Sequence, residues 1–195
     1  ILLSGQKGVG KCTLAYHLIN YILSQGEENS YYIEKYQINK NNKSFRLIQN
    51  RTNPNFTLID VLLEKKKIDI SQIRNLITDL NKSSFNLKPR FVLVDNIEFL
   101  NINSINALLK ILEEPSQGIH FILIHNNKKI LPTLKSRCLN YQIFLTHEKS
   151  ANVCEKLLSS NIHDLISKDL LDYYFTPGKI YNLINFTKAN NIDLK

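Results

Sequence analysis

The residues best suited to chemistry lie in a glycine-rich run at the start of the chain, after three apolar residues. The segment from Gly5 to Thr13 reads Gly-Gln-Lys-Gly-Val-Gly-Lys-Cys-Thr, and an amphipathic helix is expected directly after it. Glycines let consecutive backbone N–H groups point inward, the start of a helix adds positive potential, and a lysine can reach terminal phosphates. The spacing matches G-x-x-x-x-G-K-[ST], the phosphate-binding P-loop, up to its last position.

That last position is Cys12, where the motif requires a hydroxyl. The hydroxyl normally contacts Mg²⁺, a hard cation that prefers oxygen ligands and binds a thiol poorly. Thr13 lies one residue further, about 100° around the helix, so it does not simply replace the missing group. We therefore expect a loop that can hold a polyphosphate but is impaired in hydrolysing one. The alternative is a glycine-rich turn that binds no nucleotide.

Strands and helices alternate from the start of the chain to residue 144. Apolar or β-rich runs predict strands at 1–4, 56–61, 91–94, 119–124 and 141–144, while helical spacing of apolar residues predicts helices at 71–81 and 103–113. The polar segment 27–53 predicts a loop with one short helix near 31–36. The alternation predicts an α/β fold with a five-stranded parallel sheet covered by helices. Asp95 follows the strand 91–94, at the end where open α/β sheets place their ligands.

The strand pattern stops after residue 145. Three helices are predicted beyond it, at 148–159, 162–174 and 177–189, and Pro177 suits the first turn of the last one. We expect a nucleotide-binding domain over residues 1–145 and a small helical lid over residues 146–195.

The composition restricts the class of protein. None of the apolar stretches reaches 18 residues, so no membrane span is expected. Three widely separated cysteines give neither a disulfide framework nor a C-x-x-C zinc pair, which favours a reducing cytoplasm. The net charge of +8 suits acidic partners such as nucleic acid, or else reflects a bias toward Asn, Ile and Lys. Because the chain opens on a strand without methionine, we expect it to be a piece of a longer one.

The order of the remaining motifs resembles the AAA+ clamp-loader family. After the P-loop come Val94-Asp95-Asn96, then Asn-Ala-Leu-Leu-Lys-Ile-Leu-Glu-Glu-Pro at 106–115, then Ser136-Arg137-Cys138. Within that family the chain is similar to the delta-prime subunits of bacterial DNA polymerase III, through the segments 53–56, 68–74 and 176–179. The resemblance covers nearly the whole chain and implies the AAA+ P-loop NTPase fold with a lid.

The resemblance also implies roles for individual residues. Asp95 would face Mg²⁺, and Arg137 would act as the finger that one subunit inserts into a neighbour's ATP site. The residues implied to bind ATP are Lys7, Gly8, Val9, Gly10, Lys11, Cys12, Thr13, the sensor Asn126 and the second sensor Lys179. Each of four of these residues has an alternative role. Asp95 would cap a neighbouring helix, Asn126 would serve a turn, and Lys179 would be solvated. Arg137 would pair with a local carboxylate.

The chain departs from the catalytic gamma and tau subunits of that family at two places. Those subunits carry Asp-Glu where this chain has Asp95-Asn96, and an amide cannot act as a general base. Glu98 stands two residues further on. They also usually carry four zinc-binding cysteines that this sequence lacks, so no zinc is expected.

The resemblance therefore implies a delta-prime-like component of a DNA polymerase holoenzyme, a nucleotidyltransferase, with weak or no ATP hydrolysis of its own. Its partners would be gamma or tau and delta subunits, and through them the sliding clamp and primed DNA, with a helical collar beyond Lys195. The alternatives are an active gamma-type ATPase and a P-loop nucleotide kinase, which would need lid arginines that 144–195 lacks.

Overall fold

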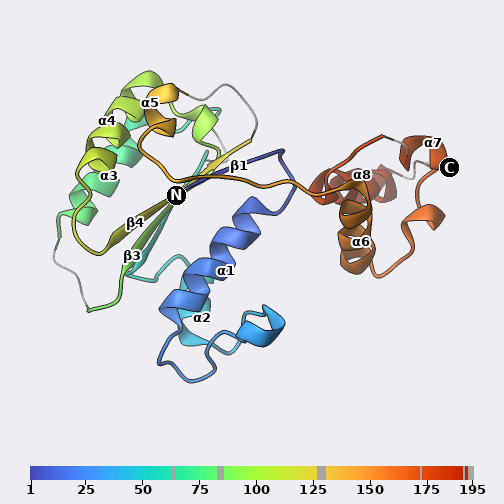
Figure 1. The fold of residues 1–195 in the computed structure, drawn as a ribbon, viewed down its shortest axis with the longest axis horizontal. Coiled ribbons are helices and arrows are strands. Elements are labelled where there is room, and N and C mark those ends of the chain that lie inside the picture. Colours follow the sequence, from blue (N-terminus) through green and yellow to red (C-terminus); the bar gives the residue numbers. More distant parts are fainter. Residues whose placement is uncertain (63–64, 83–85, 127–130, 172, 191, 193–195) are drawn as a thin grey trace. The chain divides into compact units, whose positions relative to one another are not determined.

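The computed structural model describes residues 1–62, 65–82, 86–126, 131–171, 173–190 and 192. By its internal contacts the chain divides into two compact units (Figure 1). The first consists of Ile1–Ser4 and Cys12–Tyr141, and the second of Gly5–Lys11 and Gln142–Lys195. The glycine-rich segment therefore belongs to the same unit as the carboxyl-terminal helices.

The first unit carries the strands and the helices that cover them. Its elements in chain order are β1 (Leu2–Ser4), α1 (Lys11–Leu23), α2 (Lys43–Gln49), β2 (Phe56–Ile59), α3 (Ile70–Leu80), β3 (Arg90–Val94), α4 (Ile102–Glu113), β4 (Ile119–His125), α5 (Pro132–Lys135) and β5 (Asn140–Gln142). The strands form one five-stranded sheet in the order β2-β3-β4-β1-β5. Strand β3 pairs in parallel with β2 and β4, and β4 pairs in parallel with β1. The predicted α/β fold with a five-stranded sheet is confirmed.

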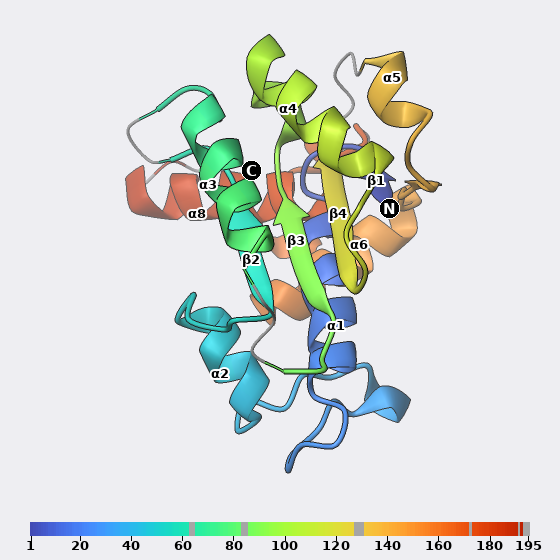
Figure 2. The ribbon, with the colours of Figure 1, turned by 90° about the vertical axis from the view of Figure 1, so that its left-hand side faces the viewer.

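Alternate residues of the central strands face opposite helical layers. Figure 2 shows α3 and α4 in front of the sheet and α1 behind it. Val92, Val94 and Leu123 pack with Ile73, Leu76 and Leu108 on the α3–α4 side. Phe91, Leu93 and Ile122 pack with Ala15, Ile19 and Leu23 on the α1 side. A strand buried on both faces explains the continuous apolar runs in the sequence. Burying each such leucine or isoleucine contributes about 1.5–3 kcal/mol.

The polar segment 27–53 contains more helix than its sequence predicted. The short helix expected near 31–36 is a 3₁₀ turn, Ile33–Lys35, and α2 occupies 43–49, where a loop was expected. Asn42 starts α2, because its side-chain oxygen accepts a hydrogen bond from the backbone N–H of Phe45 at 2.8 Å. An asparagine cap satisfies one of the free N–H groups at a helix start.

Within its described residues, the second unit contains the helices α6 (His147–Leu158), α7 (Lys168–Leu171) and α8 (Pro177–Asn190). Their small core consists of Cys154, Ile162, Ile166, Ile180 and Ile184. The first and last helices match their predicted positions closely.

The predicted bounds of the middle helix, 162–174, are wrong. A 3₁₀ turn, Ile162–Asp164, precedes the short α7, and Asp172 lies outside the described residues. Asn161 accepts a hydrogen bond from the backbone N–H of His163 at 2.9 Å. Such a local bond gives the backbone an alternative to a continuous helix.

In the part of the chain that the structure describes, no helix is long and apolar enough to cross a membrane.

Candidate functional site

The glycine-rich segment forms the turn between β1 and α1. Gly8 and Gly10 have φ angles of 94° and 92°, which side-chain-bearing residues rarely adopt. Helix α1 begins at Lys11, whose side chain is buried. The Lys11 ammonium donates hydrogen bonds to the carbonyl oxygens of Gly5 at 2.9 Å and Gln6 at 2.7 Å. A phosphate would therefore compete with the loop's own carbonyls for this cation.

The turn that begins α8 packs directly on the glycine-rich segment within the second unit. The Thr176 hydroxyl donates to the carbonyl of Lys7 at 2.8 Å, and the N–H of Gly178 donates to the carbonyl of Gly8 at 3.0 Å. A β-carbon added at Gly8 would lie 2.4 Å from the Thr176 hydroxyl and 3.2 Å from the backbone nitrogen of Lys179. The structure thus brings Lys7, Gly8 and the backbone of Lys179 together.

The next positions of the motif lie in the first turns of α1. Cys12 is half-buried and packs against the apolar cluster beneath α1, while Thr13 is exposed. Tyr16 lies one turn further along. Burial, together with the nearby Cys12, Asp95 and Asp60, raises the pKa of Tyr16 above its usual value, although Arg51 opposes the shift. The sequence analysis assigned no role to Tyr16, although the charges of Asp60 and Asp95 at the strand ends affect its pKa.

Polar side chains meet where three parallel strands end. Asp60 follows β2, Asn96 follows β3 and Asn126 follows β4. The amide nitrogen of Asn96 donates to the Asp60 carboxylate at 2.8 Å, and the amide nitrogen of Asn126 donates to the side-chain oxygen of Asn96 at 2.9 Å. The same Asn126 nitrogen lies 3.0 Å from the Glu98 carboxylate. The amide of Asn96 is therefore used on both sides and offers no proton acceptor of the strength a general base needs.

The backbone of Asn96 is in the left-handed region, with φ 56° and ψ 46°. Asparagine tolerates this conformation better than most residues because its short polar side chain can bond locally. The preceding Asp95 carboxylate accepts a hydrogen bond from the Asn96 N–H at 2.7 Å.

Asp95 can contribute one carboxylate to a metal ion. Among the described residues no three His, Cys, Asp or Glu side chains come together as a metal-ligand set. Mg²⁺ commonly takes one or two protein carboxylates together with substrate phosphates and water. Asp95 together with substrate phosphates and water fits such a magnesium site. Cys12 would weaken it, because a thiol stands where the motif normally provides a hydroxyl.

Arg137 follows α5 and pairs with a carboxylate of its own chain. Its Nε donates to Glu113 Oε1 at 2.9 Å and its Nη1 donates to the carbonyl of Thr133 at 2.9 Å. The pair lies at the surface, with 33% of the Arg137 side chain and 49% of the Glu113 side chain exposed. An exposed pair of this kind is worth about 0–1 kcal/mol. Arg137 is therefore held by its own chain but accessible from outside it.

Sequence reasoning missed three residues of these groups: Asp60, Glu113 and Thr176. Asp60 lies within the predicted strand run 56–61 and directly follows β2, so its place near the carboxyl end of that run was the signal for it. Glu113 lies within the motif 106–115, but nothing in that motif indicates its pairing with Arg137.

A family model described as DNA polymerase III, delta subunit, matches residues 1–148. The chain is 31% identical over 221 residues to DNA polymerase III subunit delta′ of Buchnera aphidicola subsp. Baizongia pistaciae, covering 98% of this chain and 64% of that protein. It is 29% identical over 205 residues to DNA polymerase III subunit gamma of Buchnera aphidicola subsp. Schizaphis graminum, covering 100% of this chain and 53% of that protein. The chain thus spans between half and two thirds of these relatives.

The fold is similar to that of a solved structure, a DNA polymerase III gamma subunit-related protein of Thermotoga maritima. The TM-score is 0.54 at 22% identity, over 94% of this chain and 52% of that one. At this identity the likeness supports the fold alone. From the match to the family model over residues 1–148, the chain belongs to the family described as DNA polymerase III, delta subunit.

Proposed function

We propose that the chain is part of a delta-prime-type subunit of a bacterial clamp loader, which works in the cytoplasm. In this proposal, residues 1–145 form the AAA+ domain and residues 146–195 its lid. The subunit assembles with gamma or tau and delta subunits, hydrolyses ATP weakly or not at all, and gives Arg137 to a neighbour's ATP site. The assembly loads a sliding clamp on primed DNA.

The observation that carries the proposal is the hydrogen bonding of Asn96. Its amide donates a hydrogen bond to Asp60 and accepts one from Asn126, so position 96 links neighbouring strand ends where an ATPase needs a general base. Two further features weaken the site. Cys12 provides no hydroxyl for Mg²⁺, and Lys11 is engaged by the carbonyls of Gly5 and Gln6.

Arg137 supports the second half of the proposal. Its guanidinium is partly exposed, and its bond to Glu113 is a surface pair that a nearby anion can replace at small cost. An arginine delivered to a neighbouring phosphoryl group can raise the rate of hydrolysis there by 10³–10⁵. A subunit without a working site of its own can still supply such a group.

A gamma-type ATPase is the second candidate, because a gamma subunit is also among the relatives of this chain. Glu98 is the residue that favours it, since its carboxylate lies 3.0 Å from the Asn126 amide at the strand ends. In that case Glu98 would replace the missing base. A P-loop nucleotide kinase has no such support from the family match.

The test compares the isolated protein with the assembled loader. Isothermal titration with Mg-ATP and a phosphate-release assay measure binding and turnover by the protein alone. The loader is then reconstituted with gamma or tau and delta subunits, carrying wild-type protein, Arg137→Ala or Arg46→Ala. Arg46 is a matched control, because it too is an arginine bonded locally, to the side chain of Asn41.

We expect negligible turnover by the isolated protein and loss of hydrolysis at the neighbouring site with Arg137→Ala, while Arg46→Ala behaves as wild type. Unchanged ATPase of the loader with Arg137→Ala would remove the finger assignment. Brisk turnover by the isolated protein that disappears in Glu98→Gln would instead establish the gamma-type alternative.

A further inference from the structure

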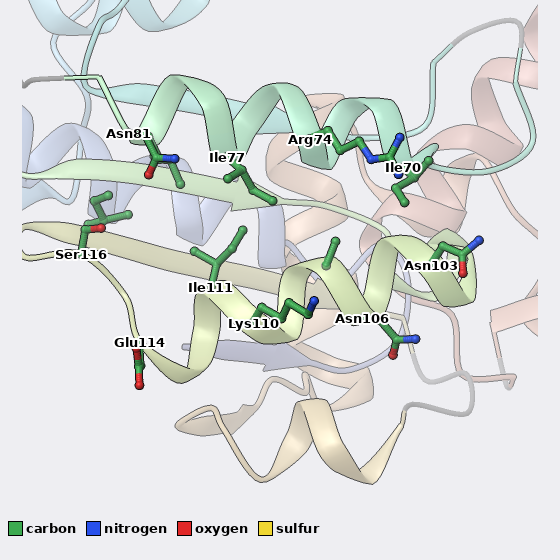
Figure 3. Close-up of a pocket in the computed structure, with 13 residues that line it drawn as sticks. Ile70, Arg74, Ile77, Asn81, Asn103, Asn106, Lys110, Ile111, Glu114 and Ser116 are labelled. Atoms are coloured by element: carbon green, nitrogen blue, oxygen red, sulfur yellow. The ribbon is translucent and has the colours of Figure 1, made fainter.

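A groove of about 770 Å³ runs between α3 and α4 in the first unit. Its lining is apolar at the bottom and polar along the rims (Figure 3). The apolar lining consists of Ile70, Ile77, Leu80, Ala107, Ile111 and Ile119. None of the residues assigned to nucleotide chemistry is among its lining residues.

Two cations lie on opposite walls of the groove. Figure 3 shows Arg74 on α3 and Lys110 on α4, with Glu114 at the far end of α4. Both cationic side chains are exposed, and neither makes an ion pair or hydrogen bond with any residue that the structure describes. Two unpaired cations above an apolar floor favour an occupant that carries carboxylates on either side of an apolar stripe.

The two helices also give the groove a direction. Figure 3 shows that α3 and α4 run the same way, with Ile70 and Asn103 at one end and Asn81 and Glu114 at the other. The amino-terminal ends of both helices carry partial positive charge, and their carboxyl-terminal ends carry partial negative charge. The end near Arg74 is therefore positive, and the end near Glu114 is negative.

We propose that this groove binds an acidic amphipathic helix of a partner protein. The walls are 11 and 12 residues long, which corresponds to about 17 Å, or three helical turns. A helix of that length presents apolar anchors at positions i, i+3 or i+4, and i+7, and its carboxylates flank them above Arg74 and Lys110. Its acidic end lies over the amino-terminal ends of α3 and α4, away from Glu114.

The groove is poorly suited to a nucleic acid backbone. A phosphate backbone is bound mainly by rows of Lys and Arg side chains, and this lining offers two cations and one carboxylate around an apolar floor.

The test uses a fluorescein-labelled, hydrocarbon-stapled 14-residue helix with leucines at the anchor positions and glutamates beside them. A second peptide has lysines in place of the glutamates, and a labelled DNA duplex of 20 base pairs is the third probe. Fluorescence anisotropy is measured with the full chain, with Arg74→Glu/Lys110→Glu, and with Lys66→Glu/Lys188→Glu. The last variant makes the same charge change at two exposed lysines elsewhere.

We expect the glutamate peptide to bind wild-type protein and the Lys66/Lys188 variant alike, and to bind the Arg74/Lys110 variant about tenfold more weakly. The lysine peptide shows the reverse preference, so the charge swap restores binding. Ala107→Trp fills the floor and abolishes binding of both peptides, with circular dichroism confirming its fold. Equal binding of the glutamate peptide to all charge variants, no binding at all, or displacement by the DNA duplex overturns the proposal.

Discussion

Replacing Gly178 by alanine tests the contact between the α8 turn and the glycine-rich segment. A β-carbon at Gly178 would lie 2.8 Å from Gly8 Cα and 3.2 Å from its carbonyl oxygen. Both are backbone atoms, so no side-chain rotation relieves the collision. By itself, alanine in a helix is favoured over glycine by up to about 1 kcal/mol. The sign of the effect therefore decides whether the contact exists.

The expected magnitude follows from what the turn must give up. Overpacking a close contact costs about 1–3 kcal/mol. If the turn moves away instead, it loses two hydrogen bonds, from Gly178 N–H to Gly8 and from Thr176 to Lys7, each worth about 0.5–1.5 kcal/mol. After the gain in helix propensity, the contact should weaken by about 1–2 kcal/mol.

Amide hydrogen exchange on the full chain, followed by NMR, measures this local opening directly. Exchange at position 178 should become about 5- to 30-fold faster in Gly178→Ala, because about 1.4 kcal/mol corresponds to a factor of ten. Gly26→Ala is the control, since Gly26 has φ 73° and nothing within 4 Å of an added β-carbon. That variant strains the backbone elsewhere and should leave exchange at 178 unchanged. Slower exchange in Gly178→Ala would refute the close approach.

Three further predictions concern single hydrogen-bond groups. Burial alone would raise the pKa of Glu27, but hydrogen bonds from Lys88 and Ser44 hold it below its ordinary value of 4.5. The stabilisation is therefore fully present above pH 4.5 and is lost as the pH falls further. Glu27→Gln should cost about 1–3 kcal/mol at pH 7 and should weaken the fall of the unfolding free energy at acid pH, measured by urea denaturation. An unchanged fall at acid pH would contradict this. Asn96→Asp should place its new carboxylate beside that of Asp60 and so destabilise the protein at neutral pH. The swap Asp60→Asn/Asn96→Asp should recover most of the lost stability, measured by thermal unfolding. Equal losses in both variants would count against the Asn96–Asp60 bond. A double-mutant cycle of Glu113→Ala and Arg137→Ala should give a coupling free energy of about 0.2–1 kcal/mol at low salt that disappears in 1 M NaCl. A coupling free energy that persists in 1 M NaCl would mean that the pair is not a surface pair.

The sheet was predictable because burial on two faces leaves a strong pattern. The run 91–94 is apolar at every position and the run 119–124 at every position but His120, which is expected where helices cover both sides of a strand. Helix α4 followed equally from apolar spacing. These features depend on local sequence, and the structure differs from the prediction by one or two residues at their ends.

Other features could not be read from the sequence because they depend on partners distant along the chain. Helix α2 is short and polar, and its start is fixed by Asn42, which also bonds to Glu27 at 3.0 Å. The bond between Asn96 and Asp60 joins residues 36 positions apart. The P-loop motif gave the glycines and Lys11, but not the packing of Thr176 and Gly178 against them.

Helix α4 lines the groove and also carries the carboxylate that pairs with Arg137. Lys110 stands on the wall of the groove, and Glu113, three residues further, holds Arg137. Residues three apart on a helix are neighbours in adjacent turns. A ligand in the groove that shifts the last turn of α4 also moves Glu113 and so changes how firmly Arg137 is held. Because binding linkage is reciprocal, moving Arg137 away from Glu113 changes the affinity of that ligand by the same factor.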